Sequence, residues 1–107
     1  VAVIHAPIRV EARASLESRL TQVGPSPSSG PVRIVFALHS AATIGIDIFD
    51  LQGRRVASLS RGVWPAGEHE ALWNGRTGEG QIAPAGIYVV RYAYPGGQDR
   101  RAIVRVR

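Results

Sequence analysis

The chain has 107 residues, of which 45% are hydrophobic and 20% charged, a composition typical of one small globular domain and not of a disordered chain. It contains no cysteine, which excludes disulfides, thiolate metal sites and cysteine nucleophiles. The formal net charge is +5 and all 13 basic residues are arginine, so the charge is compatible with an anionic partner.

Residues 1–13 alternate between apolar and polar side chains, which predicts an extended segment. Pro7 restricts it to an edge strand or an interrupted one. If this segment completes the sheet of a neighbouring copy, its candidate donor residues are Val3, Ile8 and Val10. The alternatives are an additional strand in the same sheet and the end of a preceding domain. We therefore assign residues 1–19 to this extension and residues 20–107 to the folded domain.

Two further features concern the start of the chain. Residues 15–20 are interpreted as a connector, with at most one short helical turn, because isolated helices of this length are marginal. Methionine is absent, so we expect the chain to be a processed product or part of a longer one. No apolar run approaches the roughly twenty residues of a membrane-spanning helix, and we expect no membrane insertion.

Short, evenly spaced strands follow a proline-, glycine- and serine-rich loop at residues 24–31. Apolar residues in period-two alternation indicate these strands. The predicted strands are Val32–Leu38, Thr43–Asp50, Arg54–Leu59, Gly67–Trp73, Ile87–Tyr94 and Arg100–Arg107. With the N-terminal segment they make about seven strands and no helix of normal length. This pattern predicts an all-β fold, an antiparallel immunoglobulin-like β-sandwich with an extended N-terminal segment.

The stretch of residues 67–94 is expected to organise the fold as strand, tight loop and strand, which is a central hairpin. His69 and Trp73 share one face of the first strand, and we expect Trp73 to fill the space between the two sheets. The second strand, Ile87–Tyr94, is an almost unbroken run of β-branched and aromatic residues. Such a run indicates a strand covered on both faces.

The last strand carries Arg101, Arg105 and Arg107 on one face, near the tyrosines of the preceding strand. Basic and aromatic side chains interleaved on a sheet can bind single-stranded nucleic acid or an acidic sugar, so these arginines are candidate partner-binding residues. The favoured alternative is a solvated strand whose charges discourage aggregation, and we expect no nucleic-acid partner. Asp47 is also expected to face water.

Catalytic and metal-binding patterns are sparse. The three histidines lie far apart in the sequence, at His5, His39 and His69. Of these, His69 is expected to pack in the core with a hydrogen-bonded ring nitrogen. The glycine-rich loop at residues 74–81 offers three oxygen ligands, from Asn74, Thr77 and Glu79, fewer than calcium needs. We expect turns in this loop, no catalytic residue, no metal or other cofactor, and no small-molecule site.

Three motifs carry a resemblance to a known family. The first is Leu20 to Leu38, with Leu20, Gln22, Pro25, Pro27, Ile34, Phe36 and Leu38. The second is Ile48 to Leu59, with Asp50, Gly53, Arg54, Val56 and Leu59. The third set comprises Gly67, His69, Trp73, Gly75, Gly80, Gly86 and Tyr88. In this order the motifs resemble the C-terminal sorting domains of the type IX (Por) secretion system and the immunoglobulin-like domain of the flagellar hook-capping protein.

The resemblance implies a non-enzymatic domain at the end of a secreted protein, located extracellularly or at the cell surface. Its implied partner is the export or surface-assembly machinery, which recognises the domain, and its implied role is sorting or anchoring of an attached passenger. The fold-determining residues on this view are Pro25, Pro27, Asp50, Gly53, Arg54, Gly67, Trp73, Gly75, Gly86 and Tyr88. One alternative is a structural subunit that polymerises with copies of itself by strand donation, and another is an accessory module that binds acidic polysaccharide.

Overall fold

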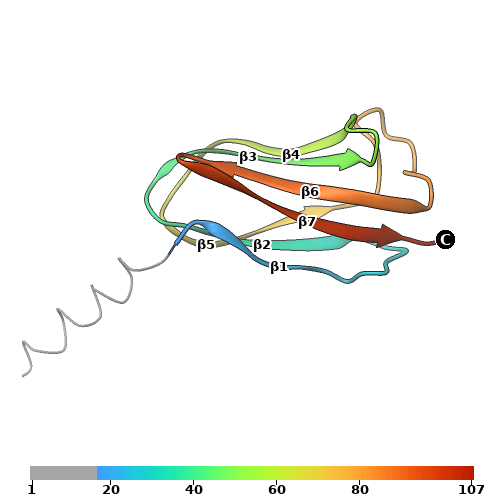
Figure 1. Cartoon of the computed structure of the whole chain (residues 1–107), viewed down its shortest axis with the longest axis horizontal. Coiled ribbons are helices and arrows are strands. Elements are labelled where there is room, and N and C mark those ends of the chain that lie inside the picture. The colour runs from blue at the N-terminus through green and yellow to red at the C-terminus, as the bar shows by residue number, and fades with distance from the viewer. Residues whose placement is uncertain (1–16) are drawn as a thin grey trace, which may run out of the picture.

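The computed structural model describes residues 17–107, and these residues form seven β-strands (Figure 1). The strands are β1 (Arg19–Gly24), β2 (Val32–Leu38), β3 (Ala42–Asp50), β4 (Arg55–Trp64), β5 (Gly67–Trp73), β6 (Gly86–Tyr94) and β7 (Gly97–Arg105). Residues 1–16 of the extension predicted at the N-terminus, which include the candidate donor residues Val3, Ile8 and Val10, lie outside the described residues. In the part of the chain that the structure describes, no helix is long and apolar enough to cross a membrane.

Two antiparallel sheets pack face to face. One has the strand order β1-β2-β5 and the other the order β4-β3-β6-β7. The expected all-β immunoglobulin-like sandwich is therefore confirmed, because this architecture consists of two packed antiparallel sheets between which the chain crosses. The number of strands also agrees, although β1 and not residues 1–13 supplies the first strand of the described domain.

The expected central hairpin is wrong. β5 pairs with β2 in one sheet, whereas β6 pairs with β3 and β7 in the other. The connection between β5 and β6 therefore crosses from one sheet to the facing sheet. Trp73 at the end of β5 and Tyr88 near the start of β6 meet edge to face across the core, with ring centroids 5.5 Å apart. Their contact is one between sheets and not one within a hairpin.

Three strands differ from the expectation by more than one residue. β1 begins at Arg19, within the expected connector of residues 15–20, because Leu20 is buried in the core and the strand pairs with β2. β4 runs on to Trp64, whose ring packs against Phe36 of the facing sheet. β7 begins at Gly97 and ends at Arg105.

The core lies between the sheets and is filled by the inward faces of the strands. Its largest fully buried apolar and aromatic side chains are those of Trp73, Tyr92, Phe36, Ile34, Leu38, Ile46, Ile48, Ile103, Val32 and Val90. The hydroxyl of Tyr92 donates to the carbonyl of Ala37 at 2.8 Å and so joins the two sheets. The strand β6 is not covered on both faces as expected, since Ile87 on its outward face is 45% exposed.

The loop at residues 24–31 is fixed to the outer edge of β7. The amide of Ser28 donates to the carbonyl of Val104, and the amide of Val106 donates to the carbonyl of Ser28, both at 2.9 Å. The amide of Val104 also donates to the hydroxyl of Ser26 at 3.0 Å. These bonds add a short parallel bridge to the sheet, so part of the β7 edge is closed to other strands.

Candidate functional site

The motif residues Asp50, Gly53 and Arg54 build the turn between β3 and β4. One carboxylate oxygen of Asp50 accepts the amides of Gln52 and Arg54 at 2.9 Å each, and the other accepts Nε of Arg54 at 3.0 Å. Hydrogen bonding from the Arg54 backbone lowers the pKa of Asp50 from its ordinary value. Gly53 has φ of +85°, a conformation that a side chain would resist. All three residues therefore have turn-forming contacts.

Tyr88 anchors the start of β6. Its hydroxyl donates to the carbonyl of Pro84, four residues upstream, at 2.6 Å, and burial raises its pKa. This is the tyrosine corner found in immunoglobulin-like sandwiches. Gly67 and Gly86 begin β5 and β6, and Pro25 and Pro27 lie in the connection between β1 and β2.

Arg105 is buried, with 5% of its surface exposed. Its guanidinium carbon lies 5.1 Å from the ring centroid of Trp73, and Nη1 donates to the hydroxyl of Ser28 at 3.4 Å and to the carbonyl of Gly30. A Cβ atom at Gly75 would overlap with this guanidinium. The side chain thus ties β7 to two loops that precede it in the chain.

The expectation that Arg101, Arg105 and Arg107 line one exposed face is wrong for Arg105. The alternation of β7 turns Arg105 inward with Ile103, and its charge is compensated by a carbonyl, a hydroxyl and an indole ring. Arg101 and Arg107 are exposed, but Arg105 between them is buried and does not contribute to an exposed face. The predicted basic and aromatic patch is therefore not formed, since Tyr88 and Tyr92 are also buried.

Asp47 does not face water, contrary to the expectation; it is 1% exposed. Both of its carboxylate oxygens accept Nη2 of Arg61 at 3.1 Å, and one accepts Nη2 of Arg91 at 3.4 Å. These arginines come from β4 and β6, which flank β3, and their long side chains cover the carboxylate. A buried charge is tolerated in a sheet when it is paired in this way.

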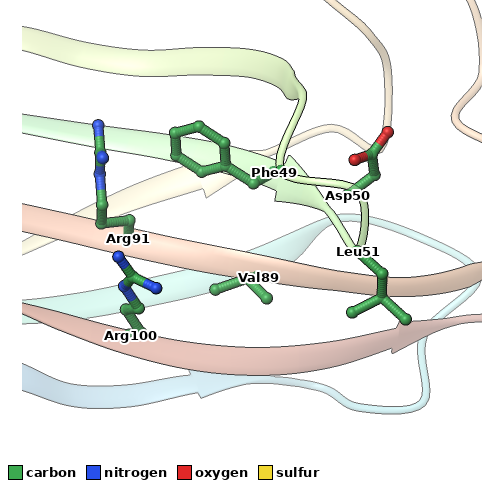
Figure 2. Close-up of a pocket in the computed structure, with 7 residues that line it drawn as sticks. Phe49, Asp50, Leu51, Val89, Arg91 and Arg100 are labelled. Atoms are coloured by element: carbon green, nitrogen blue, oxygen red, sulfur yellow. The ribbon is translucent and has the colours of Figure 1, made fainter.

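A pocket of about 320 Å³ opens beside this ion-pair network, on the outer face of the four-stranded sheet. It is lined by Phe49, Asp50, Leu51, Gly53, Val89, Arg91 and Arg100. Figure 2 shows Arg91 and Arg100 at one end, Leu51 and Asp50 at the other, and Phe49 and Val89 between them. The guanidinium carbon of Arg91 lies 4.6 Å from the ring centroid of Phe49. The arrangement combines two cationic groups with an apolar wall.

Sequence reasoning missed the pocket residues Arg91 and Arg100. One signal was present: Arg91 interrupts the otherwise apolar and aromatic run of β6. A charged residue at the centre of such a strand indicates that this side chain lies on the outward face of the sheet and pairs with an opposite charge. The position of Arg100 opposite Arg91 required the register of β6 and β7.

His69 packs as expected, with Nε2 donating to the carbonyl of Pro65 at 2.7 Å and its ring against Phe36 and Trp64. The glycine-rich loop forms turns, in which side-chain oxygens of Asn74 and Thr77 accept backbone amides. Within residues 17–107, no three side chains of the metal-ligating types His, Asp and Glu gather around a common point.

Comparison with known proteins gave a family match and matches among solved structures. The family model described as the FlgD Ig-like domain matches residues 21–97, more than half of the chain. A crystal structure of dimeric latent PorU from Porphyromonas gingivalis superposes with a TM-score of 0.69 at 20% sequence identity. The alignment covers 85% of this chain and 9% of the PorU chain, and at this identity the likeness shows a shared fold. No curated protein matches the sequence.

Proposed function

Because the chain belongs to the FlgD Ig-like domain family, we propose that it is a non-enzymatic module of a secreted or cell-surface protein. Its role is to sort an attached passenger for export or to anchor that passenger at the surface. The observation that carries this proposal is the placement of the chain ends. The chain passes into β1 at one end of the sandwich and leaves β7 at the opposite end (Figure 1), as suits a module joined in line to a passenger.

The contacts of the motif residues support a role without catalysis. The carboxylate of Asp50, the imidazole of His69 and the phenol of Tyr88 are each engaged with backbone groups of nearby turns. Catalytic acids and bases need a donor or acceptor directed at a substrate. In these three residues the polar atoms instead stabilise the loops of the sandwich.

The end of the chain supports recognition by an export or surface-assembly machinery. Arg101 and Arg107 are exposed, while the buried Arg105 between them holds the strand in place. A partner protein can therefore contact cationic side chains at two points, Arg101 on β7 and Arg107 just beyond its end. Rigid presentation favours binding because less conformational entropy is lost.

Export of a reporter tests the proposal. The full 107-residue chain is fused behind a periplasmic fluorescent protein in a bacterium with a type IX secretion system and in the same strain without it. We expect the reporter outside the cell or on its surface only when the system is present. Retention in both strains contradicts sorting.

Two controls sharpen this experiment. The double variant Arg101→Glu, Arg107→Glu leaves the buried contacts intact, and we expect it to lower export. Light scattering of the isolated chain over a wide concentration range, with negative-stain images, reports assembly. A monomer agrees with an appended module, whereas large ordered assemblies contradict it and favour a structural subunit.

A further inference from the structure

The outer face of β6 and β7 places two like charges directly opposite each other. Arg91 of β6 is the register partner of Arg100 of β7. Like charges at directly opposed positions of an antiparallel pair are destabilising. Arg91 is partly compensated by Asp47, but the guanidinium of Arg100 makes no hydrogen bond or ion pair with any residue in the range 17–107. The fold thus retains an unfavourable pair at the pocket.

The cationic end of the pocket has more positive than negative charge. Asp47 accepts two contacts from Arg61 at 3.1 Å and one from Arg91 at 3.4 Å, so one carboxylate serves two guanidinium groups. Nε of Arg91 is buried and has no hydrogen-bond partner among the described residues. The Arg91 guanidinium packs against the Phe49 ring. Arg91 is therefore held in position with incomplete compensation of its charge.

The carboxylate at the other end of the pocket, that of Asp50, already accepts hydrogen bonds within its own turn. Both oxygens of Asp50 are engaged by Arg54 and by backbone amides of the turn, and Figure 2 shows its carboxylate directed away from Arg91 and Arg100. The pocket wall between the two ends is apolar. It is continued along the same face by Ile87 and Val104, which are register partners and are 45% and 39% exposed.

These features fit a carboxylate accompanied by apolar side chains. Guanidinium groups bind carboxylates through paired, charge-assisted hydrogen bonds, and the apolar strip accepts aliphatic side chains of the same ligand. An acidic polysaccharide would present hydroxyl groups to this strip. The Phe49 ring is also unsuited to stack on a sugar, since Arg91 covers it.

We propose that the pocket beside Arg91 and Arg100 binds an acidic peptide segment of a partner protein, with a carboxylate between the two arginines and apolar side chains along β6 and β7. This site is distinct from the exposed Arg101 and Arg107, and the proposal does not depend on export. The like-charge pair is then relieved only when the partner is bound.

Fluorescence anisotropy tests the proposal with the full chain at physiological salt. The probe is a short fluorescein-labelled peptide of alternating Glu and Leu, and the matched peptide has Gln in place of Glu. We expect Arg100→Gln to weaken binding of the acidic peptide at least about tenfold, the effect of losing one charge-assisted contact. Arg19→Gln is the matched control, because it removes the same charge from an exposed residue of β1, in the facing sheet.

The variants should remain folded, because neither arginine is buried, and thermal melts check this. Arg100→Gln should melt at or above the temperature of the parent, since the repulsion with Arg91 is removed. Equal weakening by Arg100→Gln and Arg19→Gln would mean that the peptide is held only by diffuse electrostatic attraction, and it would overturn the proposal. So would equal binding of the Gln peptide, or no binding by the parent. Binding of heparin that depends on Arg100, without peptide binding, would assign the pocket to polysaccharide instead.

Discussion

The guanidinium of Arg105 lies over the indole ring of Trp73, with 5.1 Å between its central carbon and the ring centroid. Arg105 belongs to the last strand and Trp73 to the end of β5, so the contact joins opposite sheets. Among residues 17–107, no carboxylate forms an ion pair with Arg105. Its burial therefore depends on the aromatic face and on the acceptors at Ser28 and Gly30.

The first prediction concerns the shape of this cation. Arg105→Lys keeps the charge but loses the planar group that stacks on the indole and reaches two acceptors. We expect a loss of about 2 kcal/mol in the free energy of unfolding, from buried polar groups left without partners. Urea denaturation measures it. Arg101→Lys, at an exposed position, is the control and should change stability by less than about 0.5 kcal/mol. Equal midpoints for the two variants would contradict a structural role for the Arg105 guanidinium.

The second prediction compares two glycines in the loop between β5 and β6. Gly75 and Gly80 have φ of +80° and +88°, so an alanine at either position carries a similar backbone strain of about 1–2 kcal/mol. Only at Gly75 would the added Cβ also overlap with Arg105. We expect Gly75→Ala to be the more destabilising change in denaturant titrations. If both substitutions cost the same, the guanidinium moves freely and its contacts are weak.

The third prediction concerns the buried carboxylate of β3. Asp47→Asn removes the negative charge that pairs with Arg61 and Arg91 and leaves two neighbouring cations. The Arg61 side chain is 56% exposed, so this pair is only partly buried and breaking it should cost less than breaking a fully buried pair. We expect a loss of about 2 kcal/mol in the free energy of unfolding. Chemical denaturation measures the loss, with Glu79→Gln in an exposed turn as control. An unchanged midpoint for Asp47→Asn would show that the network contributes nothing to stability.

The fourth prediction concerns high pH. All the basic side chains are arginine and cysteine is absent, so the side chains that titrate near pH 10 to 12 are those of tyrosine. Burial raises the pKa values of Tyr88, Tyr92 and Tyr94, that of Tyr92 to about 12. Because the unfolded chain releases these protons first, stability is full below about pH 10 and falls as the pH rises towards 12.

Phenol absorbance and circular dichroism, recorded together, check this prediction. Ionisation and unfolding should coincide above pH 10. Tyr92→Phe should begin with lower stability, because the bond to the Ala37 carbonyl is lost, but should lose less stability per pH unit. A steep ionisation near pH 10 with the fold intact would mean that the phenols are accessible to solvent in the folded state.

Alternation along the chain was sufficient to predict most strands, because inward and outward side chains differ clearly in β2 and β5. Alternation was not sufficient to predict which strands pair, since two consecutive strands show the same alternation whether they form a hairpin or lie in facing sheets. The reading of Asp47 and Arg105 as solvent-exposed failed for a different reason. Their compensating groups lie far away in sequence, as Arg91 does from Asp47 and Ser28 from Arg105. The pocket was missed because it depends on the register of β6 and β7.

The bridge between Ser28 and the end of β7 has a mechanical consequence. The two segments run parallel, and three hydrogen bonds join Ser26 and Ser28 to Val104 and Val106. Because the chain enters and leaves at opposite ends (Figure 1), a pull on those ends loads these bonds in shear, together and not one after another. Resistance to such a force is set by the unfolding barrier. A sandwich built in this way can carry tension along its length while it stays folded.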